Sequence, residues 1–512
     1  MSIKIKTAKK IGLFTAISVL IGSIIGIGIF FKNNSVFENN DYNPYGVLIS
    51  WILASVISLL TAFSFAEVGF NHKNGAGLAG SCEKLFNKKF GRFIAFNNSV
   101  FYFGILNLSI AIFSAESLIK LFFPNQNDLS VQFHVAYLML ISLALIFIFI
   151  FFNYLSIRLS GYFQNVTTVL KFLPLIAVGI AGIVYGTMNP GNDLFNPNPT
   201  INPIQTKPIS LDGILSSIPA ILFAYDSFLG VASLQGEMEN PKKKVPLTIV
   251  LGMGICIAVY LFITIGQIMV SQGSAGGVFD LIFKDNIKLK EIFNILVHFF
   301  IFISAIGCLN SLTLVSLRSN EFAIKHRIIV GHWSLLKYSN EKNKAGMFLS
   351  FFISMFWWII LMIPSAILNT DGVIDGVSNF PTLFSFAIYG TVIFKAWINR
   401  FTKKVHVHKL PGFIVIAPLA VIGCYLAFGY QFFYRFSANV LIQGFTQNNW
   451  NEPFSWGLFF SGSTKIGSFF AMIIFFTMLV LYIVLPFIND SFIKIKYKKL
   501  NNDLFLRNEL LV

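Results

Sequence analysis

The stretch GSIIGIGIF occupies residues 22–30, inside an apolar run that extends from residue 11 to residue 31. A helix needs about 20 mostly apolar residues to cross a bilayer, so this run predicts a membrane span with Gly22, Gly26 and Gly28 at mid-membrane depth. Small residues four apart let two helices pack closely. The same glycines also suit an unwound stretch, where free backbone N–H groups at the start of a half-helix face an anion such as a carboxylate. The motif by itself fits both interpretations equally.

The composition of the whole chain indicates a membrane protein. Of the 512 residues, 55% are hydrophobic, 16% are aromatic and only 12% are charged, whereas soluble domains average about 25% charged residues. A soluble fold has no place for so much apolar surface, so the sequence requires a lipid bilayer as its solvent. The net charge of +16 would indicate a nucleic-acid partner in a soluble protein. Here the basic residues lie in short segments between apolar runs, and we therefore exclude nucleic acid.

Twelve apolar runs are long enough to span a bilayer, which predicts an all-α integral membrane protein with twelve transmembrane helices. The runs are 11–31, 47–70, 93–118, 135–155, 166–185, 214–234, 246–270, 292–315, 347–368, 380–398, 413–432 and 469–487. The first run is too long for a signal peptide and lacks a small-residue cleavage site, so we expect it to remain in the protein as a span.

The distribution of Lys and Arg predicts how these spans are oriented. One side holds 29 of the 38 basic residues and the other side holds eight, among them Lys32, while Lys171 lies inside a span. Because cytoplasmic loops are enriched in Lys and Arg, we expect both termini in the cytoplasm of a multi-pass protein of the cell membrane. The basic tail after residue 487 is expected to contact anionic lipid. The Phe- and Asn-rich composition is typical of an AT-rich bacterial genome.

The sixth run carries a second interruption. Its residues 219–230 read PAILFAYDSFLG, with Asp226 inside the apolar segment. A carboxylate that faces lipid at this depth is costly, so we expect Asp226 to face a cavity or a partner. The alternative is an aspartate that bonds to neighbouring helices for structure alone. The first and sixth spans occupy corresponding positions in two five-helix halves, and paired interruptions at such positions point to a transporter's binding site.

Three motifs resemble those of the amino acid–polyamine–organocation superfamily of permeases. GSIIGIGIF is similar to the family's G-[ST]-I-I-G-x-G-I-F signature, and residues 50–69, SWILASVISLLTAFSFAEVG, resemble its second helix. Residues 223–246, FAYDSFLGVASLQGEMENPKKKVP, resemble the pattern F-x-Y-x-G…E-x-x-N-P-x-[KR]-x-x-P. The resemblance covers the first ten spans, whereas the last two match only as hydrophobic helices.

The resemblance implies a LeuT-like fold, in which two inverted five-helix repeats surround a central site. The repeats would cover about residues 11–185 and 214–398 of a transport core at 1–400. Residues 401–512 would hold two peripheral helices, an external loop from 431 to 468 and the basic cytoplasmic tail.

The resemblance also implies where a substrate binds. Its carboxylate would meet the backbone N–H groups of Ile27 and Gly28, and its amino group the carbonyls of Ile24, Phe223 and Asp226. The Phe223 ring would form a gate over the substrate. A zwitterion that loses its water needs such preorganised dipoles at both ends. The predicted substrate-binding set is Ser23, Ile24, Gly26, Ile27, Gly28, Phe223, Tyr225, Asp226 and Ser227.

Two positions depart from the family pattern. Ile27 stands where Ser, Thr or Ala is common, so a hydroxyl contact to the carboxylate is absent. Ser227 stands where glycine is usual, and we expect it to stiffen the unwound stretch. The backbone site is unaffected by both changes, while the preference for a substrate side chain is not fixed by the sequence.

Lys171 in the fifth span needs an explanation of its own. An ammonium at that depth must snorkel to the surface, pair with another group, or lose its proton. The resemblance implies a coupling role, because proton-coupled or sodium-independent relatives carry a lysine here. Its amine would lie near Gly22 and Ser23 and near Ser311 or Thr313 of the eighth span. Since burial lowers the pKa of a lysine, we expect a proton to be a possible coupling ion.

The leading functional hypothesis is secondary active transport of amino acids, by import or exchange. Transport of polyamines or other organocations is an alternative, in which Asp226 pairs with an extra ammonium. A sensor that keeps the fold without transport is a second alternative. Whether a protein partner is needed stays open.

An enzyme finds no support in the sequence. There is no nucleophile–base arrangement, Walker loop or cofactor motif. His406 and His408 supply two metal ligands where structural sites need about four, so no metal is expected. The cysteines are Cys82, Cys256, Cys308 and Cys424, and they read as small buried hydrophobes. Ion pairs at the cytoplasmic ends of spans explain Glu67, Glu83 and Glu237.

Overall fold

The computed structural model describes most of the 512-residue chain. The described residues are 12–26, 28–69, 77–123, 131–190, 194–195, 208–226, 228, 241–271, 273–339, 343–368, 372–405, 409–450, 453–454 and 466–500.

Helices account for nearly all of the described secondary structure. The first half holds α1 (Leu13–Ile24), α2 (Gly28–Asn39), α3 (Pro44–Gly69), α4 (Gly77–Leu85), α5 (Lys88–Asn97), the π-helical turn η1 (Asn98–Tyr102), α6 (Phe103–Phe122), α7 (Val131–Leu155) and α8 (Ile157–Met188). Next come α9 (Leu211–Tyr225), α11 (Pro241–Ile268), α12 (Ala275–Ile282), α13 (Ile287–Lys325), α14 (His332–Leu335), η4 (Leu336–Tyr338) and α15 (Lys344–Leu368). The last are α16 (Gly372–Ser378), α17 (Phe380–Thr402), α18 (Phe413–Tyr430), η5 (Gln431–Ala438), α19 (Asn439–Gln447) and α20 (Ser468–Leu500). Two short strands, β1 (Pro453–Phe454) and β2 (Ile466–Gly467), pair antiparallel.

Ten helices in the described part of the chain are long and apolar enough to cross a membrane. Each of the ten overlaps one predicted span. The first and sixth predicted spans contain shorter helices instead, α1 with α2 and α9. These are the two spans for which the sequence predicts interruptions. The total of twelve spans stays a prediction.

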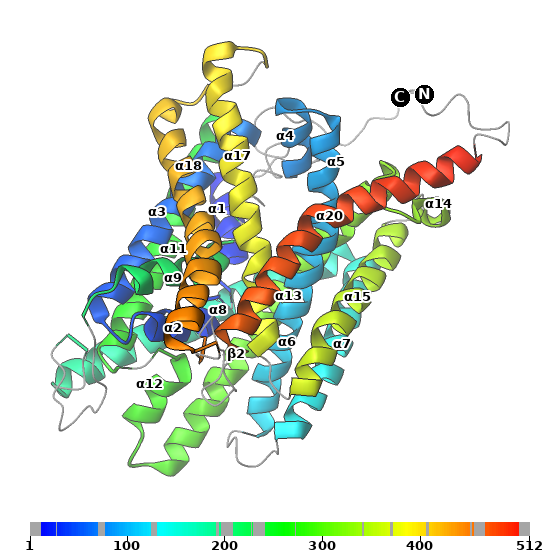
Figure 1. The fold of residues 1–512 in the computed structure, drawn as a ribbon. Helices are drawn as coiled ribbons and strands as arrows, with labels where there is room; N and C mark the ends of the chain where they lie inside the picture. The colour runs from blue at the N-terminus through cyan, green and yellow to red at the C-terminus, as the bar shows by residue number, and fades with distance from the viewer. Residues whose placement is uncertain are drawn as a thin grey trace.

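The helices pack as two groups, which Figure 1 shows side by side. In the first, here called the frame, α13 packs along α6, α7 and α15. In the second, here called the broken group, α9 packs against α2 and α3, and α11 packs against α1 and α3. Helix α8 contacts both α13 and α11 and therefore lies at the junction of the groups.

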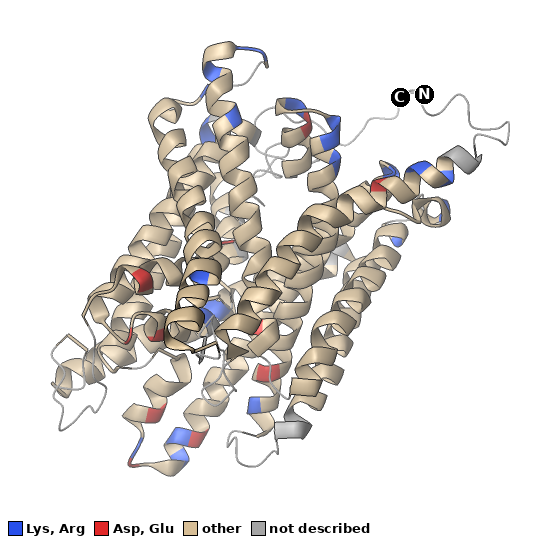
Figure 2. Cartoon of the chain, in the orientation of Figure 1, with Lys and Arg blue, Asp and Glu red and all other residues tan. Residues whose placement is uncertain are grey.

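The two ends of the molecule differ in charge. Figure 2 shows Lys and Arg concentrated at the end where α4 and α5 lie and where α17 and α20 finish, here called the basic end. There the buried Glu67 carboxylate accepts two hydrogen bonds from the Arg400 guanidinium, at 2.8 and 2.6 Å, and one from the Leu410 N–H. The expectation that an ion pair explains Glu67 is confirmed. Glu237 lies outside the described residues.

The external loop predicted from residue 431 begins later than expected. Helix α18 continues through η5 and α19 as one apolar helical unit that ends at Gln447. The prediction was wrong for 431–447 because polar residues ended the apolar run. Arg435 is paired with Asp212 at 3.2 Å, and Gln431 donates to the Leu215 carbonyl. These partners on or near α9 lie more than 200 residues away in the sequence.

Candidate substrate site between two interrupted helices

The first span is interrupted at mid-length. Helix α1 ends at Ile24, Ile25 adopts an extended conformation with φ −67° and ψ 105°, and α2 begins at Gly28. The last turn of α1 therefore leaves carbonyl groups without helical partners, and the first turn of α2 leaves N–H groups. The predicted unwound stretch is present. Ile27 itself lies outside the described residues, as does the side chain of Ser23 at the end of α1.

The glycines of this span also permit close packing. A Cβ at Gly22 would lie 2.9 Å from the Thr168 side chain, and one at Gly26 would overlap the Cys308 sulfur. A Cβ at Gly28 would lie 2.5 Å from the Ala224 Cα, so the start of α2 lies directly against α9. Both interpretations of the motif hold together: the glycines allow the contacts that hold the interruption in place.

The sixth span stops beside the interruption in the first. Helix α9 ends at Tyr225, and Asp226 follows with its side chain 7% exposed. The Thr382 hydroxyl donates a hydrogen bond to the Asp226 carboxylate at 2.8 Å. Asp226 therefore faces protein rather than lipid. Ser227 lies outside the described residues.

A tyrosine from α11 joins the ends of both interrupted helices. The Tyr260 hydroxyl lies 3.0 Å from the Ile24 carbonyl and 3.2 Å from the Ala224 carbonyl. Both acceptors belong to last turns, where the helix dipole is negative. Tyr260 is fully buried, and its ring packs on Tyr225 and Trp51 with centroids 5.1 and 5.4 Å apart. A single side chain thus fixes the spacing of the two helix ends.

Tyr225 lies behind the site rather than in it. Its side chain is fully buried, and its hydroxyl accepts a hydrogen bond from the Ser55 hydroxyl at 2.8 Å. Its ring packs against Tyr260 and Trp51. The structure therefore places Tyr225 as a support for the end of α9.

An ion pair lies beside Phe223 at the other face of the site. The Lys32 ammonium, on α2, lies 2.9 Å from the Asp375 carboxylate and 2.8 Å from the Ser378 hydroxyl on α16. It also lies 5.0 Å from the centroid of Phe223 and 5.7 Å from that of Phe113. Lys32 and Asp375 are 0% and 1% exposed. Ammonium over aromatic faces is a favourable arrangement when desolvated.

Lys171 reaches the interruption from the junction helix α8. Its amine donates a hydrogen bond to the Gly22 carbonyl at 3.0 Å and lies 3.5 Å from the Cys308 sulfur of α13. The side chain is fully buried and does not snorkel. Cys308 thus lies beside the amine, where the resemblance implied Ser311 or Thr313. Thr313 instead donates to the Leu309 carbonyl and accepts from the Asn153 amide inside the frame.

The geometry agrees with the comparisons with known proteins. The family model described as amino acid permease matches residues 11–456 of this chain. The chain belongs to the amino acid permease family. This membership confirms the resemblance seen in the motifs. The family is one of permeases rather than enzymes.

Three similar proteins match this chain over different fractions of its length. The serine/threonine exchanger SteT of Bacillus subtilis is 27% identical over 50% of this chain, and the match spans about half (53%) of that exchanger. The mouse b(0,+)-type amino acid transporter 1 is 25% identical over 81% of each chain. The crystal structure of MhsT in complex with L-phenylalanine matches with a TM-score of 0.52, covering 81% of this chain and 98% of MhsT at 16% identity. That likeness confirms the LeuT-like fold class.

Sequence reasoning did not assign three residues, Lys32, Asp375 and Tyr260, to the permease site. Lys32 was assigned to the outer side because the apolar run ends at Phe31, yet α2 continues to Asn39 and buries Lys32. Asp375, five residues before the tenth run, is the signal that could have revealed its partner. Tyr260 carries no signal of its own, since a tyrosine in an apolar span is ordinary.

Metal-ligating groups do not gather in the described part of this permease. Among the residues that the structure describes, there is no group of three or more His, Cys, Asp or Glu side chains placed to hold a metal ion. The four cysteines are buried, and none forms a disulfide. His406 and His408 lie outside the described residues.

Proposed function

We propose that the permease moves α-amino acids across the cell membrane, with the substrate held between the two interrupted helices. The observation that carries this proposal is the meeting of the two interruptions, with Gly28 against Ala224 and Tyr260 bonded to both helix ends. N–H groups at the start of α2 suit a carboxylate, and carbonyls at the ends of α1 and α9 suit an ammonium. An α-amino acid carries both groups on one carbon.

The binding contacts come mainly from the backbone. Ser23, Ile24, Gly26, Ile27 and Gly28 supply one side, with Gly28 at the start of α2. Phe223, Asp226 and Ser227 supply the other side, with Tyr225 as their support. Backbone groups recognise the part that all α-amino acids share, so the side-chain preference arises elsewhere in the site.

Two ion pairs lie at opposite ends of the site and suit alternating access. Lys32 and Asp375 join α2 to α16 over the Phe223 ring, and Glu67 and Arg400 join α3 to α17 at the basic end. Each pair links a helix of the broken group to the apolar helical segment Gly372–Thr402. Opening one pair while the other stays closed exposes the site to one side of the membrane.

The basic end is the cytoplasmic end in this proposal. Its concentration of Lys and Arg follows the positive-inside rule, and it places both termini in the cytoplasm of a bacterial cell. The substrate therefore enters past the Lys32–Asp375 pair and leaves past the Glu67–Arg400 pair during import.

Lys171 supports coupling to protons or a sodium-independent exchange. Its amine occupies the space behind the first interruption, where it holds the Gly22 carbonyl. Gain or loss of a proton there changes the charge beside the substrate site. Two similar proteins support exchange and amino acid transport, since one is named a serine/threonine exchanger and another an amino acid transporter.

Uptake into proteoliposomes tests the proposal. A labelled mixture of amino acids is offered with and without an inward proton gradient, and to vesicles that hold unlabelled amino acids. Accumulation driven by the gradient supports symport, and uptake that needs preloaded substrate supports exchange. Folded protein that takes up no amino acid under either condition contradicts the proposal, and labelled polyamines offered in the same vesicles then test the organocation alternative.

A further inference from the structure

The C-terminal turns of α20 extend beyond the packed helices. Helix α20 contains 33 residues, which gives a length of about 50 Å at 1.5 Å per residue. The hydrocarbon core of a bilayer is about 30 Å thick. Figure 1 shows α20 crossing the bundle obliquely and reaching past α5 toward α14. Residues 487–497 of α20 are here called the strap.

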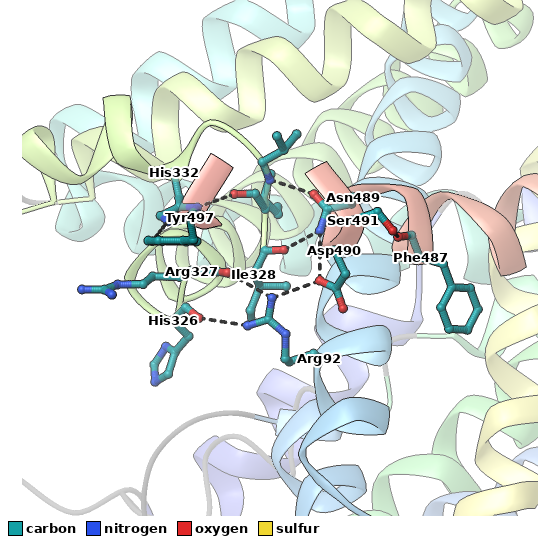
Figure 3. Close-up of polar contacts among 12 residues, drawn as sticks. Arg92, His326, Arg327, Ile328, His332, Phe487, Asn489, Asp490, Ser491 and Tyr497 are labelled. Carbon is teal, nitrogen blue, oxygen red and sulfur yellow. Dashed lines mark hydrogen bonds and ion pairs between the residues drawn. The ribbon is translucent and has the colours of Figure 1, made fainter. Parts of the chain in front are cut away.

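One face of the strap is docked onto the frame. Asn489, Ile493 and Tyr497 are spaced by four residues and so share a face. The Asn489 amide donates to the Ile328 carbonyl and accepts from the Val330 N–H, both at 2.7 Å. The Tyr497 hydroxyl lies 2.6 Å from Nε2 of His332, and Ile493 is buried. Figure 3 shows these contacts around the loop after α13.

An arginine from α5 fastens the strap from a second direction. The Arg92 guanidinium lies 3.0 Å from the Asp490 carboxylate and donates to the Arg327 carbonyl at 3.1 Å (Figure 3). The carbonyls that Arg92 and Asn489 contact follow the C-terminal end of α13, which carries the negative end of its dipole. The strap is therefore attached to α5 and α13 together.

The opposite face of the strap is apolar and exposed. Ile488, Phe492 and Ile495 are 43%, 57% and 55% exposed. At 3.6 residues per turn these three side chains share a face, and Lys494 and Lys496 project on either side of it. Both lysines are exposed. A helix with an apolar face flanked by lysines lies in the membrane interface.

The charge of this surface is one-sided. Within the strap, Asp490 is the single acidic residue, and it is paired with Arg92. The Lys496 amine lies 5.7 Å from the ring centroid of Trp333 on α14, and tryptophan is enriched at membrane–water interfaces. Apolar side chains that enter the acyl boundary beside two lysines are complementary to a lipid with a negatively charged headgroup.

We propose that the strap binds anionic phospholipid through Lys494 and Lys496 and that this lipid, by holding the strap on the frame, raises the rate of transport. The effect of the lipid on the rate of transport rests on the proposed function. The lipid's phosphate pairs with the lysines, its acyl chains contact Ile488, Phe492 and Ile495, and the docked face stays on α5 and α13. Loss of both lysines lowers lipid affinity on the order of tenfold.

Lipid binding is measured on purified, full-length protein, independently of transport. Protein in detergent with phosphatidylcholine is titrated with fluorescent phosphatidylglycerol, and bound lipid is recorded for wild type and for Lys494→Gln/Lys496→Gln. The matched control is Lys284→Gln/Lys288→Gln, which removes two exposed lysines at the opposite end. The unfolding temperature and the oligomeric state of each variant are recorded alongside. We expect the strap variant alone to bind phosphatidylglycerol about tenfold more weakly.

Transport in vesicles then tests the consequence. Wild type should transport several-fold faster in phosphatidylcholine with phosphatidylglycerol than in phosphatidylcholine alone, and the strap variant should transport at the lower rate in both. Equal phosphatidylglycerol binding by wild type and strap variant overturns the proposal, as does an equal loss in the control. A strap variant that changes oligomeric state without losing lipid indicates a second copy of the chain as the occupant and also overturns it. Absence of transport by wild type in both lipids, with lipid binding as expected, counts against the proposed function and against the rate effect.

Discussion

The frame and the broken group bury their polar groups in different ways. In the frame, uninterrupted helices are joined by neutral side-chain hydrogen bonds, such as Asn153 to Thr313 at 2.8 Å and Asn320 to Ser350 at 2.8 Å. In the broken group, helices stop within the membrane and the exposed backbone is held by Tyr260 and by contact with glycine. Straight helices satisfy their own backbone, so their side chains suffice to join them.

Buried charged groups hold the broken group to its neighbours. Lys171 links the Gly22 carbonyl to Cys308 of the frame, and Lys32 links α2 to Asp375. A buried ion pair is weak evidence for stability, because desolvation offsets much of the attraction between the charges. Such a pair suits a contact that must break during a transport cycle. We therefore expect the frame to stay rigid and the broken group to move during transport.

The largest effect on stability is expected at the buried ion pair. Lys32→Met leaves the Asp375 carboxylate buried without the ammonium 2.9 Å away, which should lower the free energy of unfolding by about 3–5 kcal/mol. Lys32→Met/Asp375→Asn should recover most of that loss. Lys290→Met breaks a pair that is about 40% exposed and should change stability by less than about 1 kcal/mol. Unfolding in detergent measures all three, and equal losses for the two single variants would contradict the assignment.

The contact between the two interruptions is expected to show the next largest effect. Gly28→Ala places a Cβ 2.5 Å from the Ala224 Cα, and such overpacking costs about 1–3 kcal/mol. Transport should fall on the order of 100-fold, since 1.4 kcal/mol corresponds to about tenfold. Gly254→Ala, in a helix of the same group with open space around it, is the matched control. Unchanged uptake by Gly28→Ala would contradict the conclusion that the broken group depends on close contact between its two interruptions.

Lys171 tests the junction between the groups. Lys171→Ala removes the donor to the Gly22 carbonyl, whereas Cys308→Ser keeps a polar group beside the amine. We expect gradient-driven uptake to fall about tenfold or more in Lys171→Ala and to change little in Cys308→Ser. Uptake with and without a proton gradient measures both. Full gradient-driven uptake by folded Lys171→Ala would remove Lys171 from the coupling mechanism.

Tyr260 tests how the helix ends are held. Tyr260→Phe removes one hydroxyl from two carbonyls, and a lost buried hydrogen bond costs about 1–3 kcal/mol. Amino acid binding should weaken about tenfold, because the end of α1 and the end of α9 are no longer held at a fixed spacing. Tyr225→Phe removes only the contact with Ser55 and should weaken binding less. Binding titrations that rank the two variants in the opposite order would show that Tyr260 merely fills space.

The strap supplies the smallest expected effect and a pH dependence. Burial lowers the pKa of His332, the hydrogen bond to the Ile329 carbonyl opposes part of that shift, and the charges of Arg327 and Arg92 add to the lowering. His332 is then neutral at pH 7 and can accept from the Tyr497 hydroxyl. As the pH falls below about 6.5, the ordinary pKa of histidine, His332 takes up a proton more readily when the strap is released than when it is docked, so docking weakens. Proteolysis of the strap in wild type should become faster as the pH falls from 7.5 to 5.5, about 1 unit on either side of 6.5. His332→Gln should lose this pH dependence. A rate of proteolysis that does not change with pH in wild type would exclude His332 as a pH-sensitive contact.

The sequence predicted the fold through the lengths of apolar runs and predicted both interruptions through glycine and aspartate inside them. It did not predict the burial of Lys32, because the partner Asp375 lies 343 residues away and a single sequence does not show such pairs. The same reason hides Asn33, which accepts from Trp51 and donates to Gln267. Polar residues with distant partners ended the predicted runs early. The sequence predicted features that depend on neighbouring residues, such as apolar runs and their interruptions. It did not predict buried polar contacts between residues far apart in the chain.

Competition binding tests most directly whether the two interruptions hold an amino acid by both of its charged groups. Purified permease is titrated with a labelled amino acid found in the uptake screen, and three analogues compete: the unlabelled amino acid, its methyl ester and the amine formed by removing its carboxylate. The account predicts that the unlabelled amino acid displaces the label and that both analogues bind at least about 100-fold more weakly, because each leaves one set of helix-end dipoles without its charge. Displacement by the amine as strong as by the amino acid itself would contradict the account.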